Sequence, residues 1–158
     1  MSKIFADKGY VYMISNAGNH PAATNTLLAS LDIPRDPIGS HLWISAGVAP
    51  SIIPQLAGLV RSNVGAICHL AGISRSTVTR KLKASSPLSS DQGTRLYGVV
   101  LALDAVLSLH EGDIAKCMSW INRPAWGLGG KKPAEILTTY MGVLAVIDLV
   151  GQIEHGVH

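Results

Sequence analysis

The chain has 158 residues, of which 47% are hydrophobic and 15% are charged, and its formal net charge at pH 7 is +3. This length suits one domain, or two small ones that share a core, and the composition excludes a chain that is disordered throughout. The net charge is too small by itself to indicate a nucleic-acid partner, and apolar residues that are mostly Ala, Leu, Ile and Val favour an all-α fold of packed helices.

The first 50 residues are predicted to form a partly irregular N-terminal arm. Residues 9–14 (Gly-Tyr-Val-Tyr-Met-Ile) are a candidate short strand, because strand-forming residues are followed there by a cluster of turn residues. Pro34 and Pro37 are expected to break any regular element before residue 40. We therefore predict a mobile arm with one short element, followed by an apolar segment at residues 41–44 that docks on the core.

Residues 51–86 are predicted to form a helix-turn-helix DNA-binding unit. Ser51 is expected to cap a helix over residues 52–60, because its hydroxyl can accept from a backbone N–H in the first turn. Asn63 is expected to cap a second helix over residues 64–71 in the same way. Together with the helix that follows the turn, they would make a three-helix unit.

The turn after the second helix carries the most specific pattern of this unit. Gly72 can adopt the positive φ that a sharp helix exit needs, and Ile73 can fill the space between two helices. Ser74 is a good N-cap for a third helix. Val78 and Leu82 lie four residues apart on that helix and are expected to face inward.

The opposite face of this third helix is short, polar and cationic, as in a helix that reads the major groove of DNA. The residues assigned to DNA binding are Arg75, Ser76, Thr77, Thr79, Arg80 and Lys83. We expect the two arginines and Ser76 to approach base edges, and Thr79 and Lys83 to contact phosphates. The alternative is an ordinary amphipathic surface helix.

The charges are unevenly distributed along the chain, and their distribution favours DNA binding. Residues 41–90 contain five Lys or Arg and no Asp or Glu, a net charge of +5. Residues 1–40 are neutral, and residues 91–158 carry five bases and seven acids, a net charge of −2. The basic block therefore coincides with the candidate DNA reader.

Residues 87–158 are predicted to form a second helical unit around one long helix. Ser89 is expected to open this helix with Gln92 as its capping-box partner, and apolar residues three or four positions apart continue it to about Leu109. A further helix is expected at about residues 113–121. The long helix would then be the backbone of the fold.

Residues 122–132 form a long turn that ends in Gly-Gly-Lys. This ending invites comparison with a phosphate-binding loop, but the spacing G-x-x-x-x-G-K-[ST] is absent and no strong strand precedes it. A connector is therefore the favoured interpretation. A small enzyme that uses Lys131 or Lys132 on a phosphate is a poor alternative, because no acid–base pair accompanies the lysines.

The last part of the chain is predicted to contain a short helix and a longer one. Pro133 suits the first position of the short helix, and Thr138 or Thr139 caps the last helix, from Tyr140 to about His155. Apolar residues on this last helix cover more than one stripe, so the helix needs two partners. One can be the core, and we expect the second to be another copy of the chain in a homodimer.

No pattern indicates catalysis, a cofactor or a metal site. Cys68 and Cys117 lie within apolar helical patterns and are expected to be buried free thiols in a reducing compartment. His155 and His158 could ligate a metal, although a solvated tail is the favoured interpretation. The start of the chain lacks the apolar region of a signal peptide, and no uncharged apolar run reaches about 18 residues. We therefore expect a cytoplasmic protein with no membrane contact.

From residue 51 to residue 156 the chain resembles the Xre/MbcA/ParS antitoxin family. The turn pattern Ala-Gly-Ile-Ser followed by Thr-Val-Thr-Arg is also close to that of many bacterial repressors. The C-terminal segments that carry the resemblance are Leu88-Ser89, Arg95-Leu96, residues 120–124 (Trp-Ile-Asn-Arg-Pro), residues 128–133 (Leu-Gly-Gly-Lys-Lys-Pro), residues 137–139 (Leu-Thr-Thr), Gly142, and residues 153–156 (Ile-Glu-His-Gly). Each is weak individually, and their order makes the set specific.

The resemblance implies an antitoxin that binds and occludes an NAD⁺-consuming toxin with a RES domain, forms dimers and represses its own operon. Residues of the types that anchor interfaces, together with the end of the chain, are the candidate toxin contacts: Arg123, Trp126, Ile153, Glu154, His155 and His158. Trp120 is favoured as a core residue, whereas Arg95 is either a buried structural arginine or a toxin contact. The main alternative is a dimeric helix-turn-helix repressor without a toxin partner.

Overall fold

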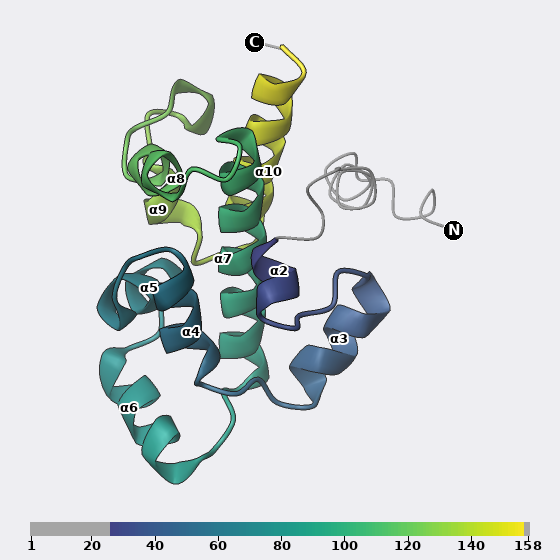
Figure 1. Cartoon of the computed structure of the whole chain (residues 1–158), viewed down its shortest axis with the longest axis vertical. Helices are drawn as coiled ribbons and strands as arrows, with labels where there is room; N and C mark the ends of the chain where they lie inside the picture. The colour runs from purple at the N-terminus through teal and green to yellow at the C-terminus, as the bar shows by residue number, and fades with distance from the viewer. Residues whose placement is uncertain (1–25, 157–158) are drawn as a thin grey trace.

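The computed structural model describes residues 26–156, and every regular element in that range is a helix (Figure 1). The predicted all-α class is thus confirmed, while the candidate strand at residues 9–14 lies outside the described residues. The elements are α2 (Leu27–Ser30), α3 (Pro37–Ser45), α4 (Ile52–Leu59), α5 (Val64–Ala71), α6 (Arg75–Ala84), α7 (Ser90–Leu109), α8 (Ile114–Ile121), the 3₁₀ helix η3 (Trp126–Leu128), α9 (Pro133–Ile136) and α10 (Tyr140–Glu154).

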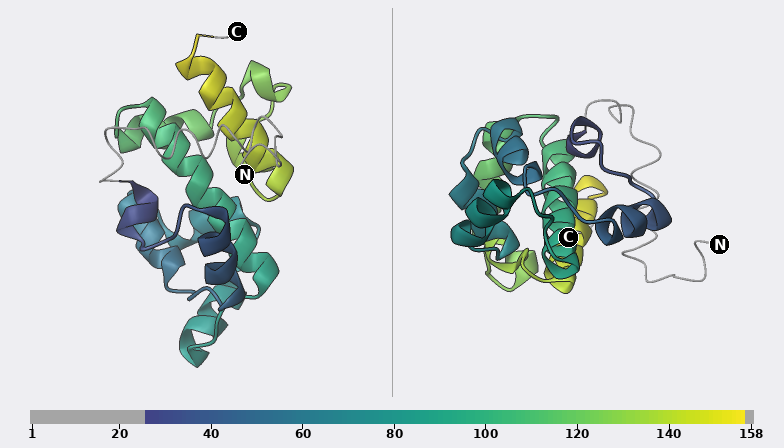
Figure 2. Two further views of the ribbon diagram at one scale, coloured as in Figure 1. Left: turned by 90° about the vertical axis from the view of Figure 1, so that its right-hand side faces the viewer. Right: turned by 90° about the horizontal axis from the view of Figure 1, so that it is seen from below.

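The long helix α7 is the centre of the fold, as predicted. The Ser89 Oγ accepts from the Gln92 N–H at 3.1 Å and the Gln92 Oε1 accepts from the Ser89 N–H at 3.0 Å, so the expected capping box is present. The helix packs against α10, α8, α5, α2 and α3 (Figures 1 and 2). Leu96 and Leu103 are completely buried on it.

One hydrophobic cluster connects both halves of the chain. It includes Leu56 of α4, Val78 of α6, Leu96 of α7, Cys117 of α8 and Val150 of α10. The boundary predicted near residue 87 therefore falls in a connection within a shared core. If residues 51–86 were removed, the side of α7 that packs on α5 would be exposed to solvent.

Residues 26–50 are more regular than predicted. Pro37 does not break the segment, because it is the first residue of α3, a position where its missing N–H costs nothing. Asp36 caps this helix through a 2.7 Å bond from the Gly39 N–H, and Thr26 caps α2 in the same way. Residues 26–50 thus contain two helices that we did not predict. The expected docking of residues 41–44 is confirmed for Trp43 and Ile44, which pack against the core.

Polar contacts with α7 fasten these N-terminal helices, and none of them could be read from local sequence. The Asp104 carboxylate accepts from the Leu27 N–H at 2.9 Å and pairs with the Arg35 guanidinium at 3.3 Å. Seven residues before Asp104 on α7, the Tyr97 hydroxyl lies 2.7 Å from the Ser40 Oγ. Each contact joins residues that are far apart in the chain.

Cys68 and Cys117 are buried free thiols, as predicted. Burial raises the pKa of the Cys68 thiol, although Arg75 partly opposes this shift. Burial, reinforced by the Asp104 carboxylate, raises the pKa of Cys117 to about 12. Both thiols therefore remain protonated at neutral pH. None of the helices between residues 26 and 156 combines the length and hydropathy needed to cross a bilayer.

Candidate DNA-binding and partner-binding surfaces

Helices α4, α5 and α6 form the predicted three-helix unit, and most of its predicted caps are present. Asn63 caps α5 through a 2.8 Å bond from the Ala66 N–H, and Gly72 ends α5 with φ +66°. Ile73 is 4% exposed and fills the turn. Ser74 accepts from the Thr77 N–H at 3.2 Å and so caps α6. Ser51 was expected to cap α4, but it makes no such bond because its backbone is already helical.

Helix α6 is attached to the body mainly through its first half. Val78 is 1% exposed and faces the core, as predicted, whereas Leu82 is 39% exposed. The prediction that Leu82 faces inward was therefore wrong. Helix α6 packs mainly on α5, and its C-terminal end projects beyond it at one end of the molecule (Figure 1). One turn after Val78, the second apolar position of α6 therefore stays partly exposed to solvent.

Four of the six residues assigned to DNA line a single open hollow. Its volume is about 600 Å³, and its lining consists of Ser76, Thr79, Arg80, Lys83 and Ala84. The face therefore presents two hydroxyls and two cations with no carboxylate. Hydrogen-bond donors of this kind suit the acceptor-rich edges of bases and the phosphates of DNA.

The other two assigned residues lie outside this hollow. Thr77 is half-buried, and its hydroxyl accepts a 2.7 Å bond from the Ser74 Oγ, so it belongs to the cap of α6. Arg75 is exposed but lies along α5, since its Cδ would be 3.4 Å from a Cβ placed on Gly65. The two arginines of α6 therefore occupy different parts of the surface.

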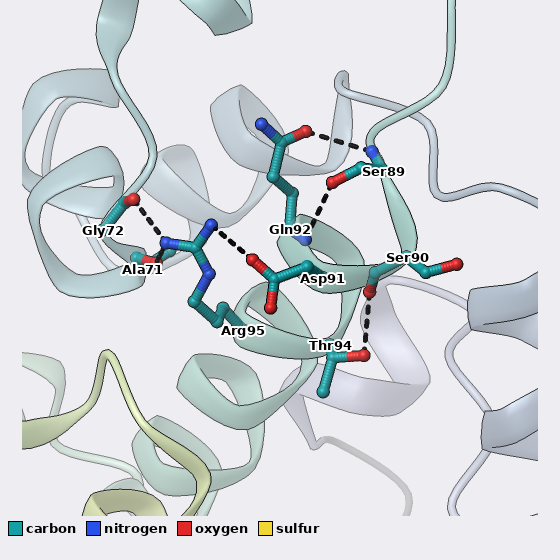
Figure 3. A network of polar contacts seen from close by, with 8 residues as sticks. All are labelled: Ala71, Gly72, Ser89, Ser90, Asp91, Gln92, Thr94 and Arg95. Atoms are coloured by element: carbon teal, nitrogen blue, oxygen red, sulfur yellow. Dashed lines mark hydrogen bonds and ion pairs between the residues drawn. The ribbon is translucent and has the colours of Figure 1, made fainter.

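Arg95 of α7 supports the turn that precedes α6 (Figure 3). Its Nη1 donates to the Gly72 carbonyl oxygen at 2.5 Å and to the Ala71 carbonyl oxygen at 3.3 Å, and its Nη2 pairs with the Asp91 carboxylate at 2.9 Å. The carbonyls at the end of α5 thus receive donors from another helix. Of the two predicted roles for Arg95, these contacts match the structural one. Its spacing of four from Asp91 is the only sequence signal, and it does not indicate the turn.

Substitution of Arg95 tests this support. We expect Arg95→Met to lower the free energy of unfolding by about 1–3 kcal/mol, because it removes charge-assisted donors from the partly buried Ala71 carbonyl oxygen and the exposed Gly72 carbonyl oxygen. Urea unfolding monitored by circular dichroism measures the loss. Lys116→Met is the matched control, since Lys116 is exposed on α8. Equal unfolding midpoints for the two variants would contradict a supporting role for Arg95.

The segment after α8, with η3, and the end of α10 carry the candidate toxin-binding residues that the structure describes, and both lie at the opposite end of the molecule from α6 (Figures 1 and 2). Arg123 is exposed, and Trp126 in η3 is 98% exposed. Ile153 is 37% exposed at the end of α10, where Glu154 and His155 are also exposed. His158 lies outside the described residues.

The turn that carries Trp126 packs against the same side of α10 that carries Ile153. A Cβ placed on Gly127 would lie 2.5 Å from the Leu149 Cδ1, so the η3 backbone passes very close to α10. Leu149 and Ile153 are four residues apart and therefore share one face of this helix. The fold thus brings the two parts of the predicted partner surface to one side of the molecule.

The Gly-Gly-Lys segment is a connector, as predicted. Its N–H groups are used inside the turn: Gly129 donates to the Trp126 carbonyl oxygen at 3.1 Å, and Gly130 donates to the Ala125 carbonyl oxygen at 3.0 Å. Lys131 donates in the same way to Leu128 at 3.2 Å. A phosphate loop needs such amides to point toward its ligand, and these do not.

Three local predictions for the C-terminal part of the chain are confirmed. Helix α9 begins at Pro133, and Thr139 caps α10 through the Gly142 N–H at 3.1 Å. Trp120 is half-buried and packs against the core.

Between residues 26 and 156 no three His, Cys, Asp or Glu side chains gather as a metal site would require. At the start of α10, Tyr140 and Met141 are exposed by 53% and 69%.

Two family models match adjacent parts of the chain. Residues 44–100 match the antitoxin Xre-like helix-turn-helix domain, and residues 102–156 match the antitoxin Xre/MbcA/ParS C-terminal toxin-binding domain. The first match covers α4 to α6 together with most of α7. The second covers the end of α7 and all helices after it.

Curated relatives match over most of their length. The antitoxin Xre of Yersinia enterocolitica is 31% identical over 141 residues, covering 87% of this chain and 84% of the relative. The antitoxin Xre of Photorhabdus laumondii is 29% identical over 141 residues, covering 88% and 95%. A protein of Sphingobium sp. named Prs ADP-ribosylating antitoxin is 25% identical over 121 residues, covering 72% and 76%.

Proposed function

Because the chain belongs to the Xre/MbcA/ParS antitoxin family, we propose that it neutralises a RES-domain toxin by occlusion and represses its own operon. The family consists of non-enzymatic regulators, so the chain is a binding protein rather than an enzyme. The observation that supports the proposal best is the pair of surfaces at opposite ends of one helical core: the cationic hollow on α6 and the Trp126 side of α10.

DNA binding is assigned to α6. The hollow lined by Ser76, Thr79, Arg80 and Lys83 faces away from the core, and residues 41–90 carry a net charge of +5 without an acid. Helix-turn-helix proteins gain operator affinity by placing two recognition helices about one turn of DNA apart, which requires two copies of the chain. We therefore propose a homodimer, with the exposed Tyr140 and Met141 as candidate contacts.

Toxin binding is assigned to the Trp126 side of α10, with Arg123, Trp126, Ile153, Glu154, His155 and His158 as candidate contacts. Occlusion requires shape and a few anchoring side chains, and no chemistry. An NAD⁺-consuming toxin needs cationic groups for the phosphates of its substrate, and the acidic end of α10 would suit such a site. The name of the Sphingobium relative links an antitoxin of similar sequence to ADP-ribosylation, a reaction that uses NAD⁺. These activities would place the protein in the cytoplasm.

The proposal is tested by separating the two surfaces in the full-length chain. We expect Arg80→Ala to protect cells against a RES-type toxin from the neighbouring reading frame as well as the wild type does, while losing operator affinity. Deletion of residues 154–158 should weaken protection and leave operator binding nearly intact. Cell rescue, NAD⁺ consumption in vitro and gel shifts measure the three effects.

The test also distinguishes the main alternative, a dimeric repressor without a toxin partner. Such a protein would bind its operator, but it would neither bind the RES-type toxin nor slow NAD⁺ consumption. If the deletion variant protects as well as the wild type, the end of α10 is not part of the toxin-binding surface.

A further inference from the structure

Trp126 is almost completely exposed although backbone hydrogen bonds close the turn around it. Its exposed fraction is 98%, the highest among the large apolar side chains between residues 26 and 156. The turn is closed by two 3.0 Å bonds, from the Ala125 N–H to the Lys131 carbonyl oxygen and from the Gly130 N–H to the Ala125 carbonyl oxygen. Leu128 packs against the core behind it. An indole held in solvent by such a turn needs little further ordering before it binds.

The turn packs against the Leu149 side chain of α10. A Cβ placed on Gly127 would lie 2.5 Å from the Leu149 Cδ1, so this side chain would have to move to admit one. The residue next to Trp126 therefore lies against the helix while the indole points away from the protein. The position of Trp126 relative to α10 is set by packing rather than by the tryptophan itself.

The turn is also cationic, in contrast to the half of the chain that contains it. Residues 91–158 carry a net charge of −2, yet residues 122–134 contain Arg123, Lys131 and Lys132 and no acid. All three are exposed, and no ion pair involves any of them in the described part of the chain. The nearest acid in sequence, Glu135, accepts from the Lys132 N–H at 3.0 Å and caps α9.

The position of the turn makes DNA an unsuitable partner for it. The turn lies beside α10, whereas α6 lies at the other end of the long axis (Figures 1 and 2). Its Gly129, Gly130 and Lys131 amides are bonded internally, so they cannot bind phosphates. An exposed tryptophan in a turn that also carries an exposed arginine matches instead the residue types that anchor protein interfaces.

We propose that the Trp126 turn, residues 122–132, is the main anchor for the toxin and inserts its indole into an apolar pocket rimmed by carboxylates. This inference rests on the proposed function and specifies the chemistry of the partner surface. The basic turn would meet an acidic part of the toxin, while Glu154 at the end of α10 would face the cations of its nucleotide site. Charge complementarity of this kind fixes the orientation of a complex and accelerates its formation.

The proposal predicts separate kinetic effects for the indole and for the charges. Trp126→Ala should weaken toxin binding at least about tenfold, mainly through faster dissociation, because it empties the pocket. The double variant Lys131→Glu/Lys132→Glu should slow association about tenfold at low salt, and the difference should shrink as salt is added. Surface plasmon resonance with full-length chain and catalytically impaired toxin measures both rates.

Two exposed residues elsewhere provide matched controls. Ile38→Ala removes another large exposed apolar side chain, on α3, and Lys116→Glu reverses an exposed charge on α8. The proposal is overturned if Trp126→Ala and Lys131→Glu/Lys132→Glu change the dissociation and association rates no more than these controls do. If the wild-type chain binds no toxin, the proposed function fails and the anchor fails with it.

Two further outcomes would assign the turn to another partner and overturn the proposal. If Lys131→Glu/Lys132→Glu reduces operator affinity as much as Arg80→Ala does, the Trp126 turn binds DNA. If Trp126→Ala changes the oligomeric state in light scattering but leaves toxin binding unchanged, the Trp126 turn contacts a second copy of the chain.

Discussion

Replacement of both Arg75 and Arg80 by alanine is expected to reduce operator affinity by about 2–4 kcal/mol, which is roughly 30- to 1000-fold. Arg80 lines the hollow on α6, where a guanidinium can make a bidentate contact with a guanine edge. Arg75 lies along α5 beside Gly65 and is better placed for a phosphate than for a base. Both side chains are exposed, so we expect the thermal unfolding midpoint to change little.

The two single variants should change DNA binding in different ways as well as by different amounts. Arg80→Ala should relax the preference for one operator base pair, whereas Arg75→Ala should weaken binding to all sequences and reduce the salt dependence. Fluorescence anisotropy on operator and scrambled duplexes at several salt concentrations separates the two effects. Lys116→Ala, at the other end of the molecule, is the control. Unchanged operator affinity in the double variant would rule out α6 as the DNA reader.

The helix-turn-helix unit could be predicted from sequence because its determinants are local. The caps at Asn63 and Ser74 act over three residues, and the positive φ of Gly72 is a property of glycine itself. The capping box of Ser89 and Gln92 and the start of α9 at Pro133 are local in the same sense. Each of these elements begins where its pattern predicts.

Features that depend on distant partners could not be predicted in this way. Helices α2 and α3 are held by Asp104 and Tyr97, about 57 to 77 residues away in the chain. Leu82 has the spacing of a core residue, but it is 39% exposed near the projecting end of α6. Arg95 reaches a turn 23 residues before it, and only the folded chain distinguishes its two predicted roles.

The partner surface was predicted by residue type, but its geometry was not. Tryptophan and arginine are common anchors at interfaces, which identified Trp126 and Arg123 as candidates. Their sequence context does not reveal that η3 packs on Leu149. The basic residues of the turn are visible in the sequence, but the net charge of the acidic half includes them. Average charge over a segment of 68 residues conceals a short turn of the opposite sign.

A methyl group added to Gly142 is expected to destabilise the fold strongly. A Cβ at this position would lie 1.6 Å from the Ile136 carbonyl oxygen and 2.7 Å from its carbonyl carbon. Because backbone atoms cannot rotate away, α9 and α10 would have to separate. Alanine normally stabilises a helix by up to about 1 kcal/mol relative to glycine. Overpacking typically costs about 1–3 kcal/mol and sometimes more, so we expect Gly142→Ala to lose at least about 2 kcal/mol.

Gly58 provides the matched control, since it is also a helical glycine but a Cβ on it would meet no atom within 4 Å. Gly58→Ala should therefore gain roughly 0.5–1 kcal/mol, and the two variants should move the urea midpoint in opposite directions. Helix α10 carries Leu149, against which the Trp126 turn packs, so separation of α9 and α10 should also weaken toxin binding. A Gly142→Ala protein as stable as the wild type would contradict this prediction, since the added Cβ cannot fit beside the Ile136 carbonyl group unless the two helices move.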